Sequence, residues 1–160
     1  SFALGYRLVG LAARALGGSA LAETARPTVT ALRDVTGESA QLWLPDGEWR
    51  VCLLSVEATH ELRTIVDEGS RVAIDVGSGG RALQGEAGTA GWVATVGERA
   101  DGVGSVSAGV LGPSGSVVAA VGISGPIDRL GDDPGARFGG DVVAAANELS
   151  EALGVPPRHG

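Results

Sequence analysis

The stretch GWVATVGERADGVGSVSAGVLGPSGSVVAAVGISGP, Gly91–Pro126, decides the fold. It holds three runs of β-prone residues, Trp92–Val96, Val103–Leu111 and Val117–Ser124, separated by short polar or glycine-rich pieces. Such runs bounded by turn formers are typical of strands. The linker GPSG joins the last two runs and suits a hairpin turn, because glycine and proline favour its backbone angles.

Upstream of this stretch the chain predicts more strands. Ser39–Leu44 and Trp49–Ser55 flank the turn PDGE and indicate a β-hairpin, since proline, aspartate and glycine are turn formers. Leu62–Val66 is predicted as a third short strand. Val72–Val76 then leads into the glycine-rich piece GSGGRALQG, Gly77–Gly85, which we expect to open a short helix.

Apolar residues spaced three and four apart predict helices at both ends of the chain. In the N-terminal part they form two apolar faces, the first of Leu4, Leu8, Leu11 and Ala15, and the second of Leu21, Ala25, Val29 and Leu32. A first helix is expected to end at Gly17 and Gly18, and a second to run from Ser19 to about Gly37 with an interruption at Pro27. The piece from 128 to 140 is expected to be irregular and exposed. A closing helix follows, and its apolar face is Val142, Ala146, Leu149 and Leu153, with Gly154 and Pro156 as its stop.

This order of helices and strands predicts an α+β domain. We expect a mostly antiparallel sheet of about six strands with the helices packed mainly on one face. The length of 160 residues fits one such domain.

Composition excludes several classes of protein. The chain has twelve arginines, no lysine and 19 acidic residues, which gives a net charge of −7. This charge does not suit direct binding of nucleic acid. A single cysteine, Cys52, excludes an internal disulfide, and with two histidines it cannot form a Cys/His zinc cluster. No apolar run reaches the length of a membrane span. We therefore expect a cytoplasmic protein without a metal, a cofactor or a membrane partner.

Candidate functional residues point to binding rather than catalysis. Gly77–Leu83 follows a strand and starts a helix, where free backbone N–H groups attract a small carboxylate, although the local pattern alone favours a plain glycine-rich turn. Ser105 and Ser107 alternate in one predicted strand and share a face. His60 and His159 stand in no catalytic or metal-binding motif. These features predict a binding cavity and no enzyme.

Three stretches together resemble the effector-binding domain of the IclR family of bacterial transcription regulators. They are LGYRLVGLA (Leu4–Ala12), EGSRVAIDVGSGGRALQG (Glu68–Gly85) and the long stretch Gly91–Pro126. The resemblance implies a GAF-like antiparallel sheet that holds a small organic effector on one face. It also implies dimers or tetramers that control DNA binding by a separate winged helix-turn-helix domain. On this basis residues 1–160 form one effector-binding domain, residues 1–17 are its linker-type helix, and the DNA-binding domain lies outside this chain.

The resemblance also implies the residues that line the effector site. Hydroxyls and backbone amides are expected to converge on a small organic acid, with a wall from the strand at 62–66. The expected residues are Ser78, Gly79, Thr95, Ser105, Gly122 and Ser124, with Leu62 and Thr64 as the wall.

Several positions depart from the family pattern. Ala73 and Asp75 replace the usual proline and histidine, and Arg81 replaces lysine. Between Gly85 and Gly91 the family carries a few tens of residues that form two helices, whereas this chain has only Glu86–Ala90. The helices are either deleted or missing from the sequence given. An aspartate at position 75 would repel an anion, so a neutral or cationic effector stays open.

Three hypotheses follow. The first is a sensing and oligomerising domain. The second is a degenerate scaffold that keeps subunit contacts and binds nothing, which the short Gly85–Gly91 connection favours. The third is a small hydrolase that uses Ser78 or Ser105, which requires a base within hydrogen-bond reach that neither histidine is expected to supply.

Overall fold

The computed structural model describes residues 2–154, with side chains from residue 18 onward. The predicted stop at Pro156 and the residue His159 lie outside this range, as do the side chains of Leu4, Leu8, Leu11 and Ala15. The elements are α1 (Phe2–Thr36), β1 (Ser39–Asp46), β2 (Trp49–Val56), β3 (Arg71–Ala73), α2 (Gly77–Leu83), the 3-10 turn η1 (Gly88–Ala90), β4 (Val93–Val96), β5 (Val103–Leu111), β6 (Val117–Pro126), α3 (Ile127–Leu130) and α4 (Pro134–Ala152).

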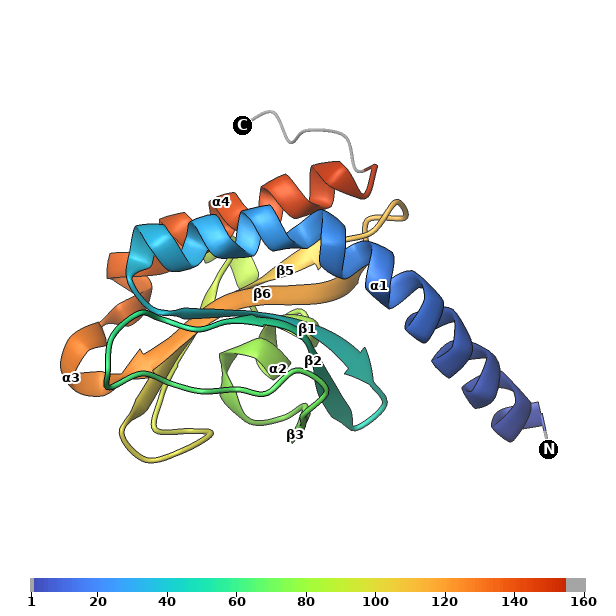
Figure 1. Cartoon of the computed structure of the whole chain (residues 1–160), viewed down its shortest axis with the longest axis horizontal. Coiled ribbons are helices and arrows are strands. Elements are labelled where there is room, and N and C mark those ends of the chain that lie inside the picture. Colours follow the sequence, from blue (N-terminus) through green and yellow to red (C-terminus); the bar gives the residue numbers. More distant parts are fainter. Residues whose placement is uncertain (1, 155–160) are drawn as a thin grey trace.

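A six-stranded sheet organises the molecule. Its strand order is β3-β2-β1-β6-β5-β4, and every neighbouring pair is antiparallel. The long helices α1 and α4 lie side by side on one face, and the short α2 lies against the other (Figure 1). The predicted α+β class and antiparallel sheet are confirmed. No helix in the described range is long and apolar enough to cross a bilayer.

Alternation along the strands gives the two faces of the sheet different chemistry. In β5, Val106, Ala108 and Val110 are buried in the core beneath α1 and α4. Ser105 and Ser107, which alternate with them, point to the face that carries α2, because successive side chains of a strand point in opposite directions. One face is therefore a hydrophobic core, and the other is lined in part by hydroxyl groups.

The two helices predicted for the N-terminal part are one continuous helix. α1 runs through Gly17, Gly18 and Pro27 without a break. Its predicted apolar face is correct where side chains are described, since Ala25, Val29 and Leu32 are buried against the sheet. Pro27 is exposed, so its effect on the helix falls on the solvent side, and packing of the opposite side outweighs the local cost of proline.

The predicted strand Leu62–Val66 is wrong. Residues 57–70 form an irregular connection, and β2 pairs instead with β3. Side chains satisfy carbonyls of this connection in place of a neighbouring strand: Ser39 donates to the oxygen of Thr64 at 2.6 Å, and Arg129 donates to that of Leu62 at 2.8 Å. Leu62 is consequently 70% exposed.

The prediction that residues 128–140 are irregular is also wrong, because α3 and the first two turns of α4 occupy most of this segment. Asp133 caps α4 by accepting a hydrogen bond from the Ala136 amide at 3.1 Å. Glycine disfavours helices, which is why the sequence misleads here. The structure explains why two of these positions are glycine. A Cβ on Gly135 would lie 2.1 Å from the Trp92 indole, and a Cβ on Gly139 would lie 2.4 Å from it.

This packing predicts opposite effects for two alanine substitutions in one helix. Gly139→Ala should lower the free energy of unfolding by about 2 kcal/mol, because overpacking against Trp92 exceeds the gain in helix propensity. Gly140→Ala should raise it by about 0.5–1 kcal/mol, because Gly140 is exposed with nothing within 4 Å of the added carbon. Urea denaturation measures both. Equal effects of the two substitutions would contradict the assigned role of Trp92.

Candidate functional site

A small cavity lies between the hydroxyl-bearing face of the sheet and α2. Its volume is about 20 Å³, which is room for roughly one water molecule. The lining contains two arginines and several hydroxyls but no acidic residue, in a chain with 19 acids. The lining residues are Gln41, Trp43, Arg50, Val66, Ser78, Gly79, Arg99, Ser105, Ser107, Ile123 and Ser124.

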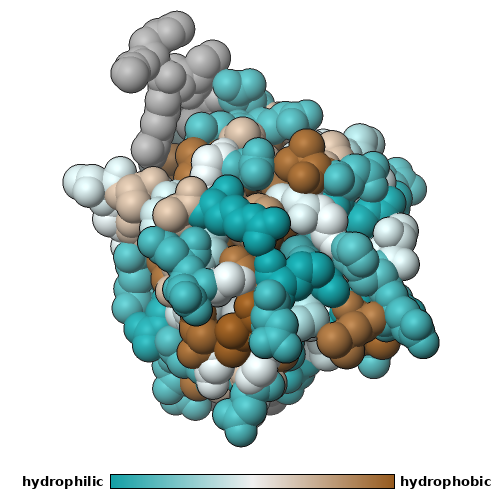
Figure 2. Space-filling model, turned by 90° about the vertical axis from the view of Figure 1, so that its left-hand side faces the viewer, coloured by the Kyte–Doolittle hydropathy of each residue, from teal (hydrophilic) through white to brown (hydrophobic). Residues whose placement is uncertain are grey.

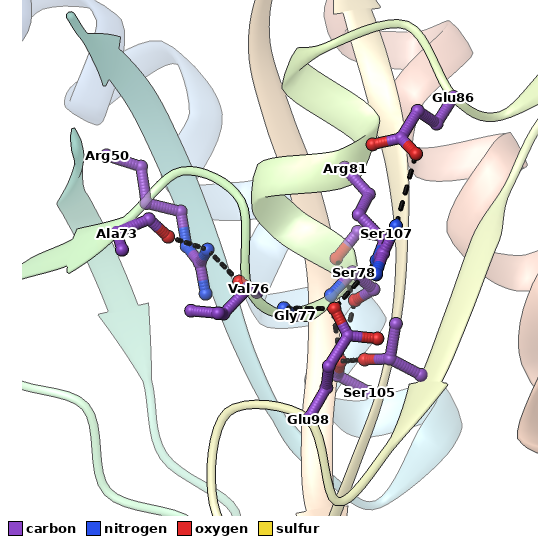
Figure 3. A network of polar contacts seen from close by, with 11 residues as sticks. Arg50, Ala73, Val76, Gly77, Ser78, Arg81, Glu86, Glu98, Ser105 and Ser107 are labelled. Carbon is purple, nitrogen blue, oxygen red and sulfur yellow. Dashed lines mark hydrogen bonds and ion pairs between the residues drawn. The ribbon is translucent and has the colours of Figure 1, made fainter. Parts of the chain in front are cut away.

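Hydroxyl groups from three elements, α2, β5 and β4, meet at one side of this cavity. The Ser78 hydroxyl, at the start of α2, lies 2.7 Å from the Ser105 hydroxyl and 2.8 Å from that of Ser107 (Figure 3). The Thr95 hydroxyl on β4 lies 3.0 Å from that of Ser105. Because each hydroxyl both donates and accepts, the cluster can reorient to serve a ligand.

Arg50 places a guanidinium at the opposite side of the cavity. The residue is 2% exposed, and the guanidinium carbon lies 4.6 Å from the centre of the Trp43 ring. Its Nη1 donates to the carbonyl oxygens of Ala73, at 2.9 Å, and Val76, whereas its Nε has no partner (Figure 3). Burial, and then the nearby charge of Arg99, lower the pKa of Arg50 to about 10. Arg50 therefore remains charged at neutral pH.

Two more donors face the same space. Arg99 lines the cavity from the β4–β5 loop, and burial lowers its pKa. Gln41 accepts a hydrogen bond from the Ser124 hydroxyl at 3.2 Å, while its amide nitrogen Nε2 is buried without a partner. A buried donor without an acceptor is costly, so the cavity favours a ligand that brings acceptor atoms.

The glycine-rich start of α2 serves mainly to accommodate Arg50 and Trp43. A Cβ on Gly79 would lie 3.1 Å from the Trp43 ring, and one on Gly80 would lie 1.8 Å from the carbonyl oxygen of Ile74 and 2.7 Å from Arg50 Nη1. Gly77 has a φ of +82°, which side chains rarely adopt. We expected these glycines to let a ligand approach the backbone closely. In the structure, side chains of the protein occupy that space instead.

The amides at this helix start already have acceptors. The Gly77 amide donates to the carboxylate of Glu98 at 3.1 Å, and the Ser78 amide donates to the Ser105 hydroxyl at 3.4 Å (Figure 3). The expected carboxylate at this position is thus supplied by the protein itself. The positive groups that remain for a ligand are the two arginines.

The structure brings together most of the residues predicted for the site. Ser78, Gly79, Ser105 and Ser124 line the cavity. Thr95 lies in the hydroxyl cluster, and a Cβ on Gly122 would lie 2.2 Å from the Ser107 hydroxyl, so both are adjacent to it.

The predicted wall is not part of the cavity. Leu62 is exposed, and Thr64 is buried beneath the irregular connection without lining the cavity. Val66 from the same connection lines it instead. Asp75 is exposed and does not line the cavity. It is therefore not placed to repel an anion in the cavity, contrary to the expectation from the sequence.

Sequence reasoning missed Arg50 and Arg99. Strict alternation puts Arg50, Cys52 and Leu54 on one face of β2, but a bulge shifts the register, so that Trp43 pairs with Cys52 and Leu42 with Leu54. Arg50 and Cys52 therefore face α2, while Leu54 enters the core under the long helices. A lone arginine within an apolar strand is the signal that was available.

The cavity lacks the groups that hydrolysis requires. No histidine, aspartate or glutamate lines it, and His60 lies by Gly37, away from the serines. Burial raises the pKa of the Cys52 thiol to about 12, which leaves it unreactive. Within the described side chains, no group of three or more histidine, cysteine or acidic residues is placed to hold a metal ion.

The chain is similar in sequence to bacterial transcriptional regulators. Residues 85–151 match the family model described as bacterial transcriptional regulator IclR C-terminal. The chain is similar to the HTH-type transcriptional regulator BhcR of Paracoccus denitrificans, at 28% identity over 88% of this chain and 62% of that protein. The chain therefore spans less than two thirds of the length of this relative. The matched family and the relative are transcriptional regulators and not enzymes, as predicted.

Solved structures show the same fold. The IclR protein of Thermotoga maritima superimposes with a TM-score of 0.78 at 18% identity, covering 93% of this chain and 74% of that one. The repressor BlcR of Agrobacterium tumefaciens gives a TM-score of 0.75 at 17% identity, covering 85% and 68%. The stretch aligned with BhcR extends over 176 residues, to which this chain contributes about 141, so about 35 residues of BhcR inside that stretch have no counterpart here.

The packing of α2 on Arg50 yields a stability prediction. Gly80→Ala should lower the free energy of unfolding by about 2–3 kcal/mol, because the added carbon meets the backbone oxygen of Ile74, which cannot rotate away. Gly79→Ala should change it by less than about 1 kcal/mol, since the Trp43 ring is 3.1 Å away and can shift. Chemical denaturation measures both, and a mild effect of Gly80→Ala would show that α2 does not pack as described.

Proposed function

We propose that the chain is the C-terminal domain of an IclR-family bacterial transcriptional regulator, whose family model matches residues 85–151, and that it senses a small organic acid in the cavity beneath α2. In this proposal residues 1–160 form one effector-binding domain, and the effector controls how associated subunits place a separate winged helix-turn-helix domain on DNA. The regulator works in the bacterial cytoplasm, where DNA is accessible.

The charge of the cavity lining is the observation that favours an acid as the effector. Arg50 and Arg99 bring two positive charges to a cavity without any acidic lining residue, and two buried donors, Arg50 Nε and Gln41 Nε2, lack acceptors. A carboxylate supplies acceptor atoms and a compensating charge at once, and charge-assisted hydrogen bonds are the strongest that such a site can form. A neutral or cationic effector would leave the two arginine charges uncompensated.

The serines give the site a second recognition element. Ser78, Ser105 and Ser107 form one cluster across the cavity from Arg50. Hydroxyls can donate to a carboxylate or to a carbonyl on the same small molecule. We therefore propose Ser78, Gly79, Ser105 and Ser124 as lining residues, with Thr95 and Gly122 adjacent, and add Arg50 and Arg99 as the residues that select the charge.

The cavity is connected to α1 through β6. Ser124 lines the cavity, and a Cβ on its neighbour Gly125 would lie 2.5 Å from the Glu38 carboxylate. Glu38, two residues after α1, is buried and accepts two hydrogen bonds from Arg129, each 2.6 Å long. A ligand that moves the end of β6 must move this ion pair and with it the end of α1. We propose this as the route from effector to subunit arrangement.

Subunit association in dimers or tetramers is part of the same proposal. The groove between α1 and α4 has a volume of about 180 Å³ and is lined by Ala31, Leu32, Val35 and Ala144, with Asp141 and Glu148 among its polar residues. Val35 is 69% exposed. Exposed apolar positions on a helical face suit contact with a second subunit.

The proposal predicts selective stabilisation by carboxylates. In a thermal-unfolding screen, members of a panel of acetate, oxalate, succinate and benzoate should raise Tm, because a ligand that binds the folded state stabilises it, whereas their uncharged amides should not. Arg99→Gln should weaken binding of the active acid about 10-fold or more, by loss of a charge-assisted hydrogen bond. Isothermal titration measures the affinity.

Arg71→Gln is the matched control. It removes the same charge from the surface at β3, where Arg71 pairs with Asp46 outside the cavity, so binding should be unchanged. Equal weakening by both substitutions would indicate general charge attraction. The small cavity favours the alternative, a scaffold that keeps subunit contacts and binds nothing. A panel without any stabilising acid, while the protein still dimerises, would support that alternative.

A further inference from the structure

The β4–β5 connection, residues 97–102, has the structure of a hinged loop. Gly97 and Gly102 stand at its two ends with φ of +72° and +76°, and nothing lies within 4 Å of a Cβ built on either. Positive φ and free surroundings leave these residues able to change conformation at little cost. The loop base is fixed, because the Gly97 amide donates to Val103 at 2.8 Å and the Gly102 carbonyl accepts from Ile127 at 2.8 Å.

This loop covers the side of the cavity that is nearest to solvent. Of the eleven lining residues, all are buried except Arg99 and Ser105. Arg99 belongs to the loop, and its Cβ lies 3.6 Å from the position of a Cβ on Gly77. The way from solvent into the cavity therefore passes Arg99. The surface at this end of the molecule is mostly hydrophilic, with separate hydrophobic patches (Figure 2).

Glu98 attaches the loop to α2. Its carboxylate accepts from the Gly77 amide at 3.1 Å and from Arg81 Nε at 2.7 Å (Figure 3). Arg81 is held in turn by Glu86, whose carboxylate lies 3.1 Å from Nη1. Glu98 is thus a side chain of the loop that spans to the helix on the other side of the entrance.

We propose that residues 97–102 form a lid over the cavity, hinged at Gly97 and Gly102, and that Glu98 is the latch that holds it closed on α2. A cavity of about 20 Å³ cannot admit an organic acid unless a wall moves, and the lid is the wall whose two ends are glycines with positive φ and no atom within 4 Å of an added Cβ. Glu98 is a positioning residue: it acts on access, whereas Arg99 meets the ligand. What enters rests on the proposed function, but the motion does not.

Limited trypsin digestion of the folded chain tests the lid without any ligand. Trypsin cleaves after arginine, and cleavage after Arg99 requires the lid to leave the cavity. Glu98→Gln should accelerate this cleavage about 5- to 10-fold, because it removes an ion pair and weakens a backbone hydrogen bond at a partly exposed site. Mass spectrometry of the fragments gives the rate at Arg99, with cleavage after Arg63 in the β2–β3 connection as an internal reference.

Glu86→Gln is the matched control, since Glu86 also pairs with Arg81 but lies outside the loop. Its cleavage after Arg99 should match that of the unaltered chain. The proposal is overturned if Glu98→Gln leaves the rate at Arg99 unchanged, if Glu86→Gln raises it equally, or if cleavage after Arg63 rises in parallel. Absence of binding by every carboxylate, with the lid behaving as expected, would refute the proposed effector class and leave the lid standing.

Discussion

The guanidinium of Arg50 lies inside the protein, where removing a charge from water costs several kcal/mol unless hydrogen bonds and nearby polarizable groups compensate. Here the compensation comes from two carbonyl oxygens just before α2 and from the Trp43 ring. Those contacts fix the approach of α2 to the sheet and require glycine at its start. The position of α2 then sets Ser78 against the serines of β5. The meeting of Ser78 with the serines of β5 thus depends on one buried side chain.

The spacing of apolar residues, every second position in strands and every third or fourth in helices, predicted most of the fold. It did so because the sheet and its two long helices each bury a continuous apolar face. The errors fall where contacts between distant residues outweigh local preference. Trp92 makes glycines acceptable in α4, and Arg129 and Ser39 satisfy carbonyls of the segment 57–70 that would otherwise need a strand partner. The hydroxyls of the site followed from alternation and from resemblance. Arg50 did not, since a bulge in β2 decides which face it joins.

The short connection from α2 to β4 influences the same region. The family resemblance leads us to expect two helices there, and the structure has only the single turn η1. With so little chain available to cover it, the cavity is enclosed by its own side chains and by the β4–β5 loop. The charged residues that line this cavity are both arginines, and the space between them and the serines has room for about one water molecule.

The continuity of α1 has a mechanical consequence. A helix of 35 residues is about 52 Å long, and its first half extends beyond the sheet while its second half is packed on it (Figure 1). The pivot of this helix lies near Gly18, whose position is close to Leu53 of β2, because the residues after it are packed in the core. The half before Gly18 is about 24 Å long, so a bend of about 5° at this point displaces its first residue by about 2 Å. A small change of angle at the edge of the domain is in this way converted into a larger displacement at the far end of the helix.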